Sequence, residues 1–138
     1  MKSRSLRGLC LGNETKPIIL DDGRITKGYI IKEFHVWTTS ISGSRDPAVS
    51  LGLDKDMNAS WDARDNRQIA WAGMTTSASD RVMSFSLVDP NHLVVRDLYV
   101  KNFTNDPANY LIVIEPVTIT EDEAVIAIIK ERSQDDDR

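Results

Sequence analysis

The residues with the clearest metal-ligand spacing lie in one acidic loop. Their offsets of 1, 3, 5, 7, 9 and 12 are those of the calcium loop in EF-hand proteins, and the residues are Asp54, Asp56, Asn58, Ser60, Asp62 and Asp65. Ala59, however, replaces the glycine of the sharp turn, and Asp65 replaces the long bidentate glutamate. The pattern favours a solvated loop whose Asp and Asn side chains bond their own backbone, with a calcium site as the alternative.

The two histidines are the next candidates for chemistry. His35 lies inside an apolar run and His92 follows a turn, and no serine or cysteine motif marks either as a general base. The single cysteine, Cys10, excludes an internal disulfide. We therefore predict no catalytic residue, no metal and no cofactor. A small β-fold enzyme stays an alternative, which a deep polar pocket holding a histidine beside a carboxylate would support.

The stretch 92–100, HLVVRDLYV, predicts one long strand. It carries apolar residues on both faces and one charged pair, Arg96 and Asp97, which is typical of a strand covered on both sides. We expect the two charges to point to opposite faces and to pair with neighbouring strands. Alternatively, His92, Arg96 and Tyr99 belong to a subunit interface, since Arg and Tyr are enriched at interface cores.

The elements that must position these residues read as strands from residue 17 onward. Asp22-Gly23 predicts a hairpin turn between 17–20 and a long strand over 25–37. Further strands are predicted over 49–53, 68–74, 83–87 and 110–114. In two of them, 49–53 and 83–87, apolar and small residues alternate with the period of a half-buried strand. About seven strands with regular turns indicate an antiparallel β-sandwich or barrel.

One helix is predicted, over about residues 121–132. Thr120 and Glu123 have the spacing of a capping box, and Lys130 and Arg132 lie in the last turn, where cations are favourable. An acidic tail, 133–138, follows it.

The 138 residues have the size of one domain, and 41% apolar with 28% charged residues is ordinary for a globular protein. No segment approaches the roughly 18 unbroken apolar residues of a membrane helix. Residues 1–16 carry four Lys or Arg residues against one Glu, and we interpret them as a basic arm in front of a β-domain over 17–132. Lys2, Arg4 and Arg7 are its candidate nucleic-acid contacts, and a frayed terminus is the alternative. We expect deletion of this arm to leave the fold intact.

Four stretches cover most of residues 17–134: LDDGRITKGYIIKEFHVW, DNRQIAWAGM, LVDPNHLVVRDLYV and NYLIVIEPVTITEDEAVIAIIKERSQ. They resemble a family of small virion structural proteins of marine viruses, either capsid or capsid-associated. The resemblance implies a jelly-roll-like β-sandwich and a location in the virion, and it carries over no binding residue.

We therefore expect a non-enzymatic, homo-oligomeric protein that assembles into or decorates a capsid through its sheet and loop surfaces. Its partners would be copies of itself, other capsid proteins and, through the arm, the viral genome. Trp61, in the acidic loop, is the best aromatic candidate for such an interface. A carbohydrate- or calcium-binding β-sandwich module is the first alternative.

Overall fold

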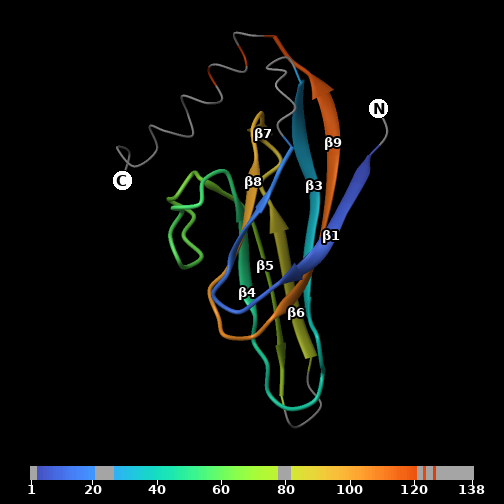
Figure 1. Ribbon diagram of the computed structural model, residues 1–138, viewed down its shortest axis with the longest axis vertical. Coiled ribbons are helices and arrows are strands. Elements are labelled where there is room, and N and C mark those ends of the chain that lie inside the picture. Colours follow the sequence, from blue (N-terminus) through green and yellow to red (C-terminus); the bar gives the residue numbers. More distant parts are fainter. Residues whose placement is uncertain (1–2, 21–26, 78–81, 121–122, 124–125, 127–138) are drawn as a thin grey trace.

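The computed structural model describes residues 3–20, 27–77, 82–120, 123 and 126. Within these residues the chain is mostly β, as the sequence predicts, and its strands form two antiparallel sheets (Figure 1). The strands are β1 (Arg4–Cys10), β2 (Thr15–Ile18), β3 (Lys27–Thr38), β4 (Ala48–Gly52), β5 (Gln68–Thr76), β6 (Val82–Val88), β7 (Leu93–Val94), β8 (Leu98–Asn102) and β9 (Ala108–Thr118).

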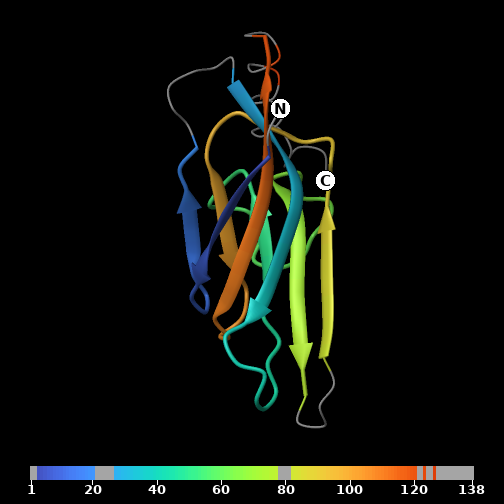
Figure 2. The ribbon, with the colours of Figure 1, turned by 90° about the vertical axis from the view of Figure 1, so that its right-hand side faces the viewer.

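The strand order defines the two layers. The first sheet has the order β1-β9-β3-β7, and the second sheet has the order β2-β8-β4-β5-β6. Figure 2 shows β6, in yellow, at one side of the molecule and β2, in blue, at the other. The second sheet therefore ends in β2 on one side and in β6 on the opposite side.

Strand pairing is nested along the chain. The first strand pairs with the ninth, the second with the eighth, the third with the seventh and the fourth with the fifth. Strand β6 is added outside this scheme, on the free side of β5. Apart from β6, the second half of the chain therefore runs antiparallel to the first half. The resulting strand pairs are divided between the two sheets.

The core lies between the sheets and takes alternate residues from each strand. In β9, Tyr110, Ile112 and Ile114 are buried, while the residues between them are half-buried. Val49 and Leu51 meet them from β4 of the second sheet, and both are fully buried. Burial thus follows the period of two that strand geometry imposes.

Two predicted elements differ in the structure. Residues 17–20 and the long strand after Asp22-Gly23 do not form a hairpin, because β2 pairs with β8 and β3 pairs with β7 and β9. The predicted strand over 92–100 is split into β7 and β8, which belong to different sheets. The chain crosses from the first sheet, at β7, to the second sheet, at β8. This crossing explains why the stretch lacks the apolar–polar alternation of a single half-buried strand.

The predicted arm over 1–16 is not a free extension in the described part. Residues Arg4–Cys10 are strand β1, which pairs with β9 over seven residues, and Cys10 is fully buried. Strand β2 begins at Thr15. Deleting this segment would remove a whole strand of the first sheet. We therefore now expect the deletion to disrupt the fold.

The predicted helix over 121–132 and the tail 133–138 lie outside the described residues, apart from Glu123 and Ile126. The contacts of the predicted capping box are present. Glu123 N donates to Thr120 Oγ1 at 3.1 Å, and Thr120 N donates to Glu123 Oε1 at 3.4 Å. No helix within the described ranges combines the length and apolar composition that crossing a bilayer requires.

Candidate interaction surface

The loop between β4 and β5, residues 53–67, packs on the outer face of the second sheet, where Figure 1 shows it in green. Met57 is only 1% exposed, and its sulfur accepts a hydrogen bond from Ser50 Oγ at 3.5 Å. A Cβ at Gly52 would collide with the same sulfur, so glycine leaves the room that Met57 occupies. Lys101 Nζ fixes the loop further by donating to Met57 O at 2.7 Å. The loop therefore covers strand β4 on the side away from the core.

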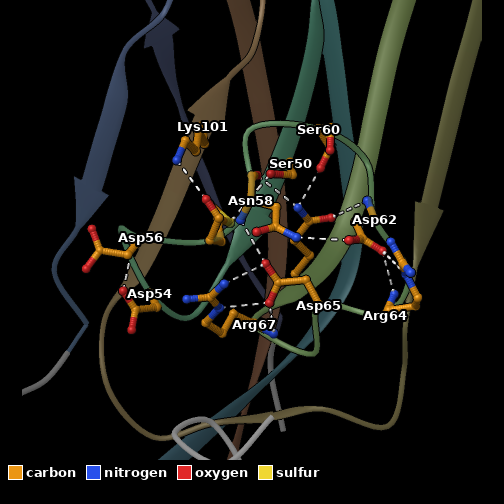
Figure 3. A network of polar contacts seen from close by, with 12 residues as sticks. Ser50, Asp54, Asp56, Asn58, Ser60, Asp62, Arg64, Asp65, Arg67 and Lys101 are labelled. Atoms are coloured by element: carbon orange, nitrogen blue, oxygen red, sulfur yellow. Dashed lines mark hydrogen bonds and ion pairs between the residues drawn. The ribbon is translucent and has the colours of Figure 1, made fainter. Parts of the chain in front are cut away.

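A buried ion pair holds the shape of this loop (Figure 3). Asp65 Oδ1 lies 2.8 Å from Arg67 Nε, and Asp65 Oδ2 lies 3.1 Å from Arg67 Nη2. The Asp65 side chain is fully buried, and that of Arg67 is 12% exposed. Asp65 Oδ2 also accepts the N–H of Asn58 at 2.8 Å. One carboxylate thus ties Asn58, inside the loop, to Arg67 at the end of the loop.

Gln68 connects the loop to strand β5. Its Nε2 donates to the carbonyl oxygens of Asn58 and Ser60, at 3.0 and 2.6 Å. Its Oε1 accepts from Asp62 N at 3.0 Å and from Trp71 Nε1 at 2.8 Å. Gln68 is 1% exposed, so these bonds satisfy a buried amide.

The carboxylates with calcium-loop spacing are used for other contacts. Figure 3 shows Asp54 and Asp56 on one side of the loop and Asp62 on the other. Hydrogen bonds from Arg64 lower the pKa of Asp62. Burial alone would raise the pKa of Asp65, but hydrogen bonds from Arg67 and Asn58 outweigh burial and lower it. No cluster of three or more His, Cys, Asp or Glu residues suited to a metal occurs among the residues that the structure describes.

Strand β6 turns its apolar side chains to solvent. Met83, Phe85 and Leu87 are 72%, 49% and 54% exposed. The direction follows from Ser86, whose hydroxyl donates to Phe34 O in β3 of the other sheet, so Ser86 faces inward and its neighbours face outward. This result reverses the half-buried pattern that the alternation over 83–87 predicts.

Trp61 extends this apolar face across the second sheet. Its ring lies 5.4 Å from that of Phe85, centroid to centroid, at an interplanar angle of 39°. Its Nε1 donates to Val49 O at 3.1 Å, which fixes the indole against the sheet, and the side chain covers Gly73. Trp61 is nevertheless 44% exposed. A rigid indole and three β6 side chains, Met83, Phe85 and Leu87, therefore form one outward surface, which we call the β6 face.

The three residues predicted as one interface are spread over two segments. His92 precedes β7, with Nδ1 3.0 Å from Asp89 Oδ2. Arg96 lies where the chain passes between sheets, next to Asp97, whose Oδ1 accepts from Leu20 N at 2.9 Å. Tyr99 lies in β8, opposite Pro17, and is half-buried. The expectation that Arg96 and Asp97 lie within one strand and point to its opposite faces is wrong, because neither residue is in a strand.

Of the predicted nucleic-acid contacts, Arg4 and Arg7 are exposed on β1, and Lys2 lies outside the described residues. Strand β1 ends the first sheet, so its two guanidinium groups lie along a sheet edge. Their role in binding nucleic acid stays a prediction.

The remaining candidates for chemistry lie in surface pairs or in the core. His35 Nε2 is 3.1 Å from Glu33 Oε1, and both side chains are about half exposed on the outer face of the first sheet. Burial, together with the Glu14 carboxylate, raises the pKa of the Cys10 thiol to about 11. The thiol is therefore protonated at neutral pH and is a poor nucleophile.

Sequence reasoning missed Met83, Phe85 and Leu87 as surface residues. The available signal was the absence of charge over 82–88, a stretch in which the alternate positions are serine or valine and not charged residues. Comparison of the chain with protein-family models, with curated proteins and with solved structures finds no significant match.

Proposed function

We propose that this protein is a structural component of a virion, and that its copies associate with one another and with other capsid proteins. The observation that supports this most is the β6 face, in which Met83, Phe85 and Leu87 lie in water beside a half-exposed Trp61. Contiguous apolar patches on soluble proteins mark interaction sites, and rigid aromatic side chains are frequent hot spots. Assembly would cover this surface.

We infer further that the fold is a β-sandwich of the jelly-roll type. Support comes from the nested pairing of first with ninth, second with eighth, third with seventh and fourth with fifth strand. A long antiparallel hairpin rolled into two sheets has this pairing. Jelly rolls occur in viral capsids, lectins and cupins, so the fold is compatible with a capsid role without singling it out. The hydrogen bonds between Thr120 and Glu123 support a helix after β9.

The resemblance of most of residues 17–134 to small virion proteins points in the same direction. In this proposal Arg4 and Arg7 on the β1 edge are the contacts to the genome. Two guanidinium groups bind a polyanion weakly, but repetition over a shell multiplies the effect.

The proposal is tested by light scattering and electron microscopy of the purified protein over a range of concentrations. We expect rings, closed particles or defined oligomers larger than a dimer. Met83→Lys should abolish them, because it places a charge at the most exposed apolar position of β6. Ile19→Lys is the matched control, since Ile19 is 70% exposed near β2, at the opposite side of the same sheet.

A monodisperse monomer at high concentration would contradict the proposal and would favour a binding module. Equal loss of assembly in Met83→Lys and Ile19→Lys would also count against it, because the β6 face would then have no special role.

A further inference from the structure

The sheets end in four edge strands, which differ in how they are protected. Strand β1 carries Arg4 and Arg7, strand β2 carries Lys16 and Pro17, and strand β7 has only two residues. Charged side chains, proline and shortness are the usual devices that stop an edge from pairing with another chain. Three of the four edges therefore have such a device.

Strand β6 has none of these devices. Its seven residues, VMSFSLV, contain no charge, no proline and no glycine, and Val82 to Leu87 are all exposed. The N–H of Asp89 bonds to Ile69 O of β5 at 2.9 Å. Because backbone groups alternate in direction along a strand, those of Ser84 and Ser86 point to the open edge. Among the residues that the structure describes, no strand pairs with this side of β6. Strand β6 thus offers a row of backbone donors and acceptors beside an apolar face.

We propose that β6 pairs antiparallel with β6 of a second copy, across a two-fold axis at Phe85. In this register Phe85 faces Phe85 of the other copy, Met83 faces Leu87, and Ser84 exchanges hydrogen bonds with Ser86. The two five-stranded sheets would join into one sheet of ten strands. The inference rests on the proposed function and assigns the contact through which copies first associate.

A second copy is the partner that the composition of β6 fits best. Because residues 82–88 are uncharged, two copies of the strand meet without like-charge repulsion. Met83, Phe85 and Leu87 lie on one face and Ser84 and Ser86 on the other. Antiparallel pairing about Phe85 therefore places apolar side chains beside apolar side chains and serine beside serine. A charged partner strand would bring charges that nothing in β6 neutralises.

The size of the surface sets the expected affinity. One strand and one indole bury less than the roughly 800 Å² per partner of a standard interface. We therefore expect a reversible pair with a dissociation constant on the order of micromolar, which further contacts in a larger assembly would strengthen.

The register is tested by cysteine cross-linking of the full chain under a mild oxidant such as diamide. Opposed residues that do not exchange hydrogen bonds in an antiparallel pair have Cα atoms about 4.5 Å apart, within reach of a disulfide. We expect Phe85→Cys to convert mostly to a covalent dimer. Mixed Met83→Cys and Leu87→Cys should cross-link to each other, whereas each alone should react little. The native Cys10 is buried and does not interfere.

Ile19→Cys is the control for random collision, since it is exposed at the far side of the same sheet. Cross-linking of Phe85→Cys no faster than Ile19→Cys would overturn the inference, as would efficient self-linking of Met83→Cys. If particles form without the Phe85 cross-link, the proposed function survives and this contact does not. If the cross-link forms but no larger assembly is seen, the contact stands and the proposed function falls.

Discussion

Asp65 is a fully buried carboxylate in a loop that is otherwise rich in exposed polar residues. Its oxygens accept hydrogen bonds from Arg67 and from the backbone of Asn58. Both charges are withdrawn from water together, so the pair specifies the loop's conformation only while both partners are present. The sequence spacing identified Asp65 as a candidate calcium ligand. It could not show that the positive charge beside this carboxylate is the guanidinium group of Arg67.

Replacing Asp65 by Asn should destabilise the protein by about 3 kcal/mol, because it leaves the Arg67 charge buried without its counter-charge. The free energy of unfolding in urea measures this effect. Asp56→Asn is the control, since Asp56 is exposed, and we expect it to change stability by less than about 0.5 kcal/mol. Equal effects of the two substitutions would contradict a structural role for the pair.

The lowered pKa of Asp65 also predicts how stability depends on pH. The pKa in the folded state lies below the unfolded value of about 3.9, so the folded protein holds the ionised form more strongly. This contribution is complete above about pH 5 and is lost as the pH falls below 3.9 through the folded pKa. We expect the stability difference between wild type and Asp65→Asn to shrink between pH 5 and pH 2. A difference that is constant over this range would be inconsistent with the lowered pKa.

At the scale of elements, the loop 53–67 has a structural role that its acidic composition does not indicate. The loop looks like a cation site from its acidic residues, yet it covers β4 through Met57 and is closed by its own hydrogen bonds. We expect millimolar calcium to leave the melting temperature unchanged, because the oxygens of Asp62 and Asp65 already have partners. A rise in melting temperature with calcium but not with magnesium would refute this expectation.

Strand β1 should be required for folding. Its removal would expose the edge of β9 and the side of Ile112 and Ile114, so deletion of residues 1–10 should abolish cooperative thermal unfolding. Arg4→Gln with Arg7→Gln keeps the strand and removes its charge, and this double variant should melt within a few degrees of wild type. A truncated protein that still unfolds cooperatively near the wild-type temperature would show that β1 is dispensable.

The strands were predictable where apolar and small residues alternate, as in β4, and where a short apolar run is continuous, as in β9. What the sequence could not supply was the direction of each face. The alternation over 83–87 is correct as a strand, but a shift of one residue in register turns its apolar side outward, and only the contact of Ser86 with β3 decides the direction. Similarly, the mostly apolar stretch from Leu93 to Val100 looks like one strand in the sequence, but its two ends belong to different sheets.

Strand β1 escaped prediction because Arg4, Arg7 and Gly8 interrupt its apolar residues. Gly8 lies on the inner face, where the ring of Tyr110 fills the space that a side chain would take. The apolar group that packs at Gly8 is the ring of Tyr110, which lies 102 positions further along the chain. A local sequence pattern cannot indicate such a contact.

At the scale of the whole molecule, the strand order separates two kinds of edge. Figure 2 shows β2 and β6 on opposite sides, and β1 with its two arginines lies away from β6. A pair joined through β6 would therefore present its basic edges at its two far ends, free to contact an acidic partner such as a genome. Apolar association and polyanion binding can then proceed together, because they use different edges of the same protomer.

Hydrogen exchange tests the central claim, association through β6, most directly. Amide exchange should be followed for the full chain at dilute and at concentrated protein, over the same times and at the same pH. We predict slower exchange at high concentration for residues 82–88, with β1 and β2 unchanged, because pairing occupies the free N–H groups of Ser84 and Ser86. Exchange in β6 that does not depend on concentration, or protection that arises at β1 instead, would contradict the account.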